Sequence, residues 1–239
     1  MQFYDMHSHI LPDFDDGAQS VEESLTLIDC LKKQNVKNIC LTPHFYTNEM
    51  SAEDFIEKRK AAYEAFLPYI PDDVNIVLGT EIFVTKFLFS NDDLSELTYG
   101  KSKYILTEFS YGSSFSEKTL QNFVMLKENH GLTPVLPHVE RYETLINDMD
   151  ALNDLRSIGV VIQTNACTYT QKMSFFKRRK LFKLISEGMI DILGSDAHSM
   201  THNTPEAYSQ AVEIITEKCG REAVKRMMNN AEEIFNSAI

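Results

Sequence analysis

The sequence predicts an α/β fold in which parallel strands alternate with helices. Seven short apolar runs are separated by longer amphipathic segments along the 239 residues, a pattern typical of repeated βα units. Right-handed crossovers can wind such units into an open sheet or close them into a barrel. Chemically reactive residues follow many different runs instead of gathering after one or two. This distribution favours the barrel.

The first half of the chain holds four of the apolar runs and two predicted helices. One helix begins at Ser20, where Glu23 completes a capping box. The other begins near Ser51 and keeps its apolar residues at helical spacing. The four runs that we interpret as strands are 2–6, 38–42, 74–78 and 104–107.

The second half of the chain continues the alternation. Its three strand-like runs are 133–136, 160–164 and 190–193. No internal repeat, low-complexity tract or flexible linker interrupts the pattern, so we expect residues 1–239 to form a single domain. The predicted helices run from Ser116 to His130 with a stop at Gly131, up to Gly159, up to Gly188, and onward from Pro205 and from Arg221.

Composition narrows the classes of partner and compartment. The net charge of −12 disfavours nucleic acid and anionic membranes, which attract clustered Lys and Arg. The four cysteines form no C-x-x-C pair, so a reduced, cytoplasmic setting is expected. No apolar run approaches the ~20 residues of a membrane span, and the N-terminus lacks a signal-peptide pattern. We therefore expect no direct membrane insertion.

The stretch from Asp5 to Gly17 carries the first chemical signal. His7 and His9 are two apart just after an apolar run, and residues two apart in a strand point to the same side. Aspartates follow immediately. Imidazole and carboxylate groups are ligands for divalent cations, so we interpret this stretch as part of a metal site. The alternative is a strand with two polar histidines and an acidic turn.

Similar residues follow the other apolar runs. Five of the seven histidines belong to this set, and its donors are imidazole and carboxylate groups. Such donors suit Mn²⁺, with Fe or Zn²⁺ as alternatives, and their number exceeds the needs of one ion. Each residue taken singly would be an ordinary loop or capping group. The set is His7, His9, Asp16, His44, Glu81, Glu108, His138, Arg141, Asp196 and His198.

These motifs together resemble the polymerase-and-histidinol-phosphatase (PHP) family. Their order and the chain length are similar to those of its bacterial protein-tyrosine phosphatases, which accompany capsule and exopolysaccharide genes. Phe45-Tyr46 follows His44 where some relatives carry further histidine or basic residues. The motifs that carry the resemblance are His7-Ser8-His9, Asp15-Asp16-Gly17, Thr42-Pro43-His44, Gly79-Thr80-Glu81-Ile82, Thr107-Glu108-Phe109, Pro137-His138-Val139-Glu140-Arg141-Tyr142 and Ser195-Asp196-Ala197-His198.

The resemblance implies a distorted seven-stranded (β/α)7 barrel, similar to a TIM barrel, with two or three divalent ions. It implies a phosphotyrosine protein as substrate, in the form of a membrane-associated tyrosine kinase that controls polysaccharide synthesis. A homo-oligomer is a further expectation. By motif position, one ion would take His7, His9, Glu81 and Asp196, a second His44, Glu81, Glu108 and His138, and a third Asp16 and His198.

The expected chemistry is hydrolysis of a phosphate ester. Two ions about 3.5–4 Å apart can hold a hydroxide at neutral pH and clamp the phosphoryl oxygens. Arg141 would bind the equatorial oxygens as charge develops. Either His198 or a metal would assist departure of the phenolate, and the sequence leaves this choice open. The residue six positions after each cysteine is never arginine, which excludes the thiol-based type of tyrosine phosphatase.

Four features lie outside this set. His130 is interpreted as structural at a helix C-terminus, and His202 has no evident partner in the sequence. The apolar residues from Phe83 to Phe89 predict core packing, with an aromatic wall beside a phosphotyrosine ring as the alternative. The basic run Lys177–Lys180 predicts a solvated helix face. Its alternative is a docking patch for an acidic partner segment or another subunit.

Two other functions compete with a tyrosine phosphatase. One is a small-molecule phosphatase of the histidinol-phosphatase type, which turnover of the two substrates separates. The other is a non-catalytic metal-binding regulatory module, which would retain metal without hydrolysing phosphate. The presence of Arg141 together with the whole ligand set argues against that module.

Overall fold

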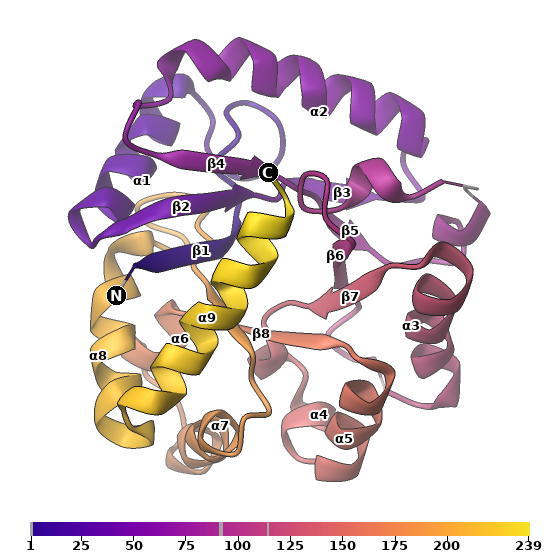
Figure 1. Ribbon diagram of the computed structural model, residues 1–239, viewed down its shortest axis with the longest axis vertical. Helices are drawn as coiled ribbons and strands as arrows, with labels where there is room; N and C mark the ends of the chain where they lie inside the picture. Colours follow the sequence, from indigo (N-terminus) through magenta and orange to yellow (C-terminus); the bar gives the residue numbers. More distant parts are fainter. Residues whose placement is uncertain (1, 91–92, 114) are drawn as a thin grey trace.

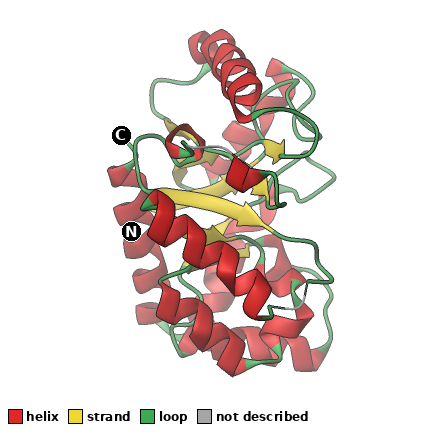
Figure 2. Ribbon diagram, turned by 90° about the vertical axis from the view of Figure 1, so that its right-hand side faces the viewer, coloured by secondary structure: helices red, strands yellow, loops and turns green. Residues whose placement is uncertain are grey.

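The computed structural model describes residues 2–90, 93–113 and 115–239 and shows a mixed α/β fold. Its strands lie in the middle of the molecule with helices around them (Figures 1 and 2). The strands in the described residues are β1 (Phe3–Ser8), β2 (Val36–Leu41), β3 (His44–Tyr46), β4 (Asn75–Leu78), β5 (Glu81–Phe83), β6 (Tyr104–Glu108), β7 (Thr133–Leu136), β8 (Val161–Asn165) and β9 (Ile192–Gly194).

The helices mostly begin and end where the sequence predicts. Ser20 and Ser51 cap their helices, while Glu23 accepts a hydrogen bond from Gln19 instead of closing the box on Ser20. Ser116 makes no side-chain cap. The described helices are α1 (Val21–Lys33), α2 (Ala52–Phe66), α3 (Glu117–His130), α4 (Glu143–Ile146), α5 (Met149–Ile158), α6 (Cys167–Thr170), α7 (Phe175–Ser186), α8 (Tyr208–Cys219) and α9 (Arg221–Ser237).

All strand pairs are parallel and fall into two sheets, β1-β2-β4 and β3-β5-β6-β7-β8-β9. Beyond two of the predicted runs, 38–42 and 74–78, the structure adds short strands that were not predicted: β3 follows β2 after Thr42-Pro43, and β5 follows β4 after Gly79-Thr80. Asn38 pairs with Asn75 and His44 pairs with Glu81, so the register is the same on both sides of the interruption. The break has a local cause, because proline has no N–H to donate to a ladder.

The first and last strands meet at their carboxyl ends. The amide of Asp196 donates to His7 O at 2.7 Å, and the amide of His9 donates to Ala197 O at 2.9 Å. Ser8 and Ala197 form a parallel bridge there. The chain segments that follow β1 and β9 are therefore held side by side, although about 190 residues of sequence separate Asp5 from Ser195.

The two faces of the strands bury different cores. Alternate residues of a strand point to opposite sides, and Ile39 and Leu136 pack under the outer helices while Cys40 and Val135 join a second cluster. Figure 1 shows α9 crossing the strands that supply this second cluster. Phe235 of α9 is among its buried members. In this way the last helix covers the face of the strands that the outer helices leave open.

No helix in the part of the chain that the structure describes is long and apolar enough to cross a membrane.

Candidate metal centre

Glu81 is the centre of a buried cluster at the carboxyl ends of the strands. The Glu81 Oε2 atom lies 3.2 Å from His7 Nε2, 3.2 Å from His9 Nε2 and 3.1 Å from His44 Nδ1. The Nε2 atoms of His7 and His9 are 3.1 Å apart, in agreement with the common direction that their spacing predicts. Three imidazole nitrogens thus surround one carboxylate oxygen.

Two further groups extend the cluster on either side of Glu81. The other oxygen, Glu81 Oε1, lies 3.0 Å from His138 Nε2, which is itself 3.4 Å from Glu108 Oε1. On the opposite side, Asp196 Oδ1 lies 3.5 Å from His7 Nε2 and 3.4 Å from the corresponding atom of His9. Residues from six different strand ends therefore converge on one point.

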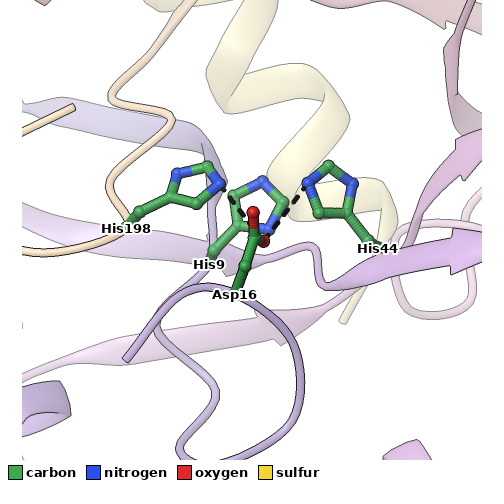
Figure 3. A group of neighbouring side chains, drawn as sticks. All are labelled: His9, Asp16, His44 and His198. Carbon is green, nitrogen blue, oxygen red and sulfur yellow. Dashed lines mark ion pairs between the residues drawn. The ribbon is translucent and has the colours of Figure 1, made fainter. Parts of the chain in front are cut away.

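Asp16 and His198 complete the set near the surface. Figure 3 shows the Asp16 carboxylate between the rings of His44 and His198, with His9 behind. Asp16 Oδ1 is 3.6 Å from the Nε2 atom of His44 and 3.6 Å from that of His198. The Asp16 side chain is 69% exposed, so this part of the cluster faces the solvent.

The hydrogen bonds of three histidines fix which ring nitrogen offers a lone pair. His9 Nδ1 lies 2.8 Å from the Asp15 carboxylate, and His198 Nδ1 lies 2.8 Å from Asp196 O. When Nδ1 donates to these acceptors, Nε2 is the nitrogen left to bind a cation on a neutral ring. His7 Nδ1 is 3.4 Å from Gln163 Oε1 in the same manner. Histidine ligands of metals show this pattern, in which the outer nitrogen donates to a second group. Without a cation, burial opposes protonation of His9, but Asp15 and the other carboxylates outweigh it and raise its pKa well above the usual value.

The charges in the cluster favour ionised forms of Glu81 and Asp196, whereas burial and the charge of Glu81 raise the pKa of Glu108. Burial alone raises the pKa of Glu81, but His7, His138 and His44 outweigh it and hold that pKa well below its usual range. Burial likewise opposes ionisation of Asp196, and its histidine neighbours and Arg141 lower its pKa nonetheless. Both groups are therefore anionic at neutral pH, as cation ligands must be.

His198 is a neutral imidazole rather than a proton donor at neutral pH. Burial and the neighbouring charge of His9 lower the pKa of His198 to about 4. Its Nε2 atom then presents a lone pair towards Asp16. Of the two roles expected for His198, the role of ligand agrees better with this environment than the role of acid.

The backbone around the cluster includes a close approach between two segments and two uncommon φ angles. A Cβ atom on Gly17 would lie 2.0 Å from His9 O, so only glycine allows the acidic turn to approach His9. His138 and Asp196 adopt positive φ angles of 36° and 55°, which are uncommon for residues other than glycine. Such strain at two members of the cluster indicates that their positions serve function.

Several donor atoms are buried and grouped closely enough to hold a metal ion. Glu81 Oε2, His44 Nδ1 and His138 Nδ1 are buried without a hydrogen-bond partner among the described residues. The donor atoms also fall into groups whose members lie within 4.8 Å of one another. These groups are His7, His9 and Glu81; His44, Glu81 and Glu108; and His9, Asp16, His44 and His198. The third group adds His9 and His44 to the pair that the family resemblance implies.

A cleft of about 360 Å³ leads from the surface to this cluster. Arg141 lies at its wall, where Nη2 donates to Asp196 Oδ2 at 2.5 Å and Nη1 donates to the Tyr111 hydroxyl at 2.9 Å. Tyr46 and Tyr111 also line the cleft and are 37% and 51% exposed. Burial raises the pKa of each phenol to about 12, so both are neutral.

Several residues of the site carry no assignment in the sequence interpretation. Asp15 accepts hydrogen bonds from His9 and from the amide of His44, and Tyr111 holds Arg141. His202 packs edge to face on His198 with ring centroids 5.2 Å apart and lines the cleft. The acidic motif indicated Asp15, but no local signal connects the other two with the site. Gln163, Asn165 and Asn203 also form hydrogen bonds with members of the cluster.

The features outside the predicted set have mixed outcomes. Leu88 is buried and Phe89 packs in the core, as predicted. The prediction of core packing is wrong for Phe87, which is 49% exposed, and the ring centroid of Phe83 lies 6.0 Å from that of Tyr46 at the site. Burial raises the pKa of Cys167 to about 11, which agrees with a packing role and excludes a reactive thiolate. The run Lys177–Lys180 lies in the first half of α7.

The fold and the cluster define an α/β protein with a candidate metal centre at its strand ends. The family model of the capsular polysaccharide synthesis proteins CpsB/CapC matches residues 3–236. Tyrosine-protein phosphatase CpsB of Streptococcus pneumoniae is 32% identical over 238 residues, which cover 93% of each chain. The chain therefore belongs to the CpsB/CapC family, and this confirms the resemblance to the capsule-associated branch seen in the sequence.

Solved structures agree on the fold. Superposition on a structure from the study of the metal-dependent tyrosine phosphatases YwqE from Bacillus subtilis and CpsB from Streptococcus pneumoniae gives a TM-score of 0.81 at 22% identity. It covers 99% of this chain and 96% of that chain. Histidinol phosphate phosphatase from Lactococcus lactis gives 0.52 at 14% identity, covering 92% and 93%. At these identities the likeness establishes the fold.

Proposed function

We propose that this protein is a metal-dependent protein-tyrosine phosphatase that uses no cysteine nucleophile. The convergence of three imidazole nitrogens on one oxygen of Glu81, at the floor of an open cleft, carries the proposal. Membership of the CpsB/CapC family supports the same reaction. The raised pKa of Cys167 supports the absence of a thiolate step.

The cluster is proposed to hold two or three divalent ions, with Mn²⁺ favoured and Fe or Zn²⁺ as alternatives. When bound, such ions supply a Lewis acid for the phosphoryl oxygens and a nucleophile at neutral pH. The residues assigned to them are His7, His9, Glu81 and Asp196; His44, Glu81, Glu108 and His138; and Asp16 with His198. The Nδ1 contacts of His9 with Asp15 and of His198 with Asp196 O, which leave the Nε2 atoms for a cation, support these assignments.

Arg141 is proposed to bind the phosphate. Its guanidinium is held in place by Asp196 and Tyr111 on the wall of the cleft, and its charge is permanent. A guanidinium fixed in this way can donate to two phosphate oxygens at once. Because it is already oriented, it stabilises the charge that develops in the transition state without reorganisation.

The rim of the cleft suits an aromatic ester. A phosphate that reaches the floor from solvent brings its organic group past Tyr46 and Tyr111. Contacts between aromatic rings contribute about 0.5–1.5 kcal/mol each. We therefore expect a phosphotyrosine side chain to be preferred over phosphoserine, because only the former presents a ring to these side chains.

The wider assignments of the sequence remain predictions. They are a phosphotyrosine protein as substrate, namely a membrane-associated tyrosine kinase, together with a cytoplasmic location and self-association. We also propose that residues 1–239 form one domain with a distorted seven-stranded barrel. The constant register across the strand interruptions and the bonds between the ends of β1 and β9 support this arrangement.

The proposal is tested by replacing Glu81 with Gln and measuring metal content and phosphotyrosine hydrolysis of the purified protein, with added Mn²⁺, Zn²⁺ or chelator. We expect Glu81→Gln to lose bound metal and activity together, because one of its oxygens is shared by three histidines. Glu49→Gln is the control, since Glu49 is exposed in the neighbouring groove. A Glu81→Gln enzyme with full activity would disprove the site.

The same assay separates the competing functions. Phosphotyrosine peptide and histidinol phosphate are compared at equal concentration with the metal-loaded enzyme. Faster turnover of histidinol phosphate would indicate that the enzyme is a small-molecule phosphatase and not a tyrosine phosphatase. Retention of metal with no turnover of either substrate would leave a metal-binding module.

A further inference from the structure

A second cavity opens beside the cleft, next to the start of α7. It measures about 240 Å³ and is called the α7 pocket below. Arg141 and Asn203 line both this pocket and the cleft, so the two cavities adjoin. A chain segment that places a phosphate in the cleft therefore passes the α7 pocket with its neighbouring residues.

The α7 pocket is bordered by free positive charge. Residues 172–180 include five basic side chains and no acidic one, in a chain whose net charge is −12. Lys172 and Lys177 line the pocket, and neither has an ion-pair partner among residues 2–90, 93–113 and 115–239. By contrast, Lys180 donates to Asn147 and Arg178 to Gln171 O. The two pocket lysines are thus available to a ligand.

One carboxylate, that of Glu140, also lines the pocket, but its oxygens are hydrogen-bonded within the protein. It is only 4% exposed. Its oxygens accept hydrogen bonds from Thr164 Oγ1 at 2.8 Å, Asn165 N at 3.0 Å and Thr168 Oγ1 at 2.9 Å. These donors satisfy the hydrogen-bonding capacity of Glu140, so its oxygens are not free to pair with a lysine, although its negative charge still acts on Arg141 and Cys167 in the pocket. Arg141 adds a further cation on the side of the cleft.

The opposite side of the cleft carries the opposite charge. A groove of about 670 Å³ beside α2 shares Asp16, His44 and Tyr46 with the cleft. It is lined by four carboxylates and one cation, Lys58, so its charge is negative on balance, and by apolar side chains such as Phe14 and Met50. An acidic side chain is repelled on this side and attracted on the other. The charge around the cleft is therefore asymmetric: it is positive at the α7 pocket and negative at the groove beside α2.

We propose that the α7 pocket binds an acidic side chain that neighbours the phosphotyrosine on the same substrate segment. The proposal rests on the proposed phosphatase function and adds the class of sequence that the enzyme selects. Phe175 and Phe176, just before Lys177, are 71% and 75% exposed and give apolar surface beside the charge. Such a combination fits a polypeptide better than a small free anion.

The test uses phosphotyrosine peptides that differ only in one neighbouring residue, which is Glu, Gln or Lys on either side in turn. With the Mn²⁺-loaded enzyme, we expect kcat/KM for the Glu peptide to exceed that for the Lys peptide about fivefold, on one side only. In the Lys172→Glu/Lys177→Glu double variant, the Lys peptide should become the preferred one. Added salt should reduce the preference, because the charges are partly exposed.

Lys183→Glu is the matched control, since Lys183 lies on the same helix but outside the pocket. Free phosphotyrosine, which has no neighbouring residues, should be hydrolysed equally by all variants. Equal turnover of all peptides, with free phosphotyrosine still hydrolysed, would overturn the pocket assignment alone. No hydrolysis of free phosphotyrosine would overturn the phosphatase function and this inference with it. A change in association state on size-exclusion chromatography, without a change in peptide preference, would assign the pocket to a second copy instead.

Discussion

The floor of the cleft and its rim are built on different principles. Asp196 at the floor, and His7, His9 and Glu81 behind it, are at most 1% exposed and contact one another and further polar groups. At the rim, side chains such as Tyr111 are half exposed, although Tyr111 also contacts Arg141 and the ring of His138. The difference indicates that the positions of buried side chains determine the chemistry. Exposed side chains at the rim determine which substrate is preferred, and they can be substituted with little loss of stability.

Arg141 lies between these two layers, and its removal should have the largest effect of the three changes considered next. Arg141→Ala should lower kcat by about 10²–10³-fold, because an oriented donor to the transition state is lost. Metal content should fall less than in Asp15→Asn, because Asp196 Oδ2 still accepts from Asn165 and Asn203 after the Arg141 contact is lost. Steady-state kinetics and metal analysis of the same preparation measure both. Arg179→Ala, an exposed residue of α7, is the control, and an unchanged kcat in Arg141→Ala would refute the phosphate-binding role.

Asp15 tests whether the second layer positions the floor. Its carboxylate accepts from His9 Nδ1 at 2.8 Å and from the amide of His44 at 2.9 Å. Asp15→Asn should weaken metal affinity about 10- to 100-fold, because the orientation and basicity of His9 depend on that partner. Metal titration measures the effect, with Asp13→Asn in the same loop as control. Equal affinities for the two variants would show that the second layer is dispensable.

Tyr111 tests the rim and should have the smallest effect. Tyr111→Leu removes a ring contact worth about 1 kcal/mol, so kcat/KM for a phosphotyrosine peptide should fall about fivefold. Turnover of a matched phosphoserine peptide should fall less, because it has no ring to lose. Tyr69→Leu, exposed on another part of the surface, is the control. An equal loss for both peptides would mean that Tyr111 acts through Arg141 and not through the substrate ring.

The sequence by itself determined the order of strands and helices and most members of the cluster. These signals are local: alternation of apolar residues marks a strand or helix, and the spacing of His7 and His9 sends two rings in one direction. Parallel strands place their carboxyl ends at the same edge. The nine side chains proposed as ligands could therefore be named before any coordinate was known, although their metal role remains a prediction.

Other features were decided only by the tertiary structure, because they depend on contacts between residues far apart in sequence. Nothing near Gln163 shows that its side chain accepts from the amide of His138, and nothing near Tyr111 shows that it holds Arg141. The α7 pocket likewise forms only where the start of α7 lies beside the wall of the cleft. Local patterns specify which side chains face the strand ends, and packing specifies which groups surround them.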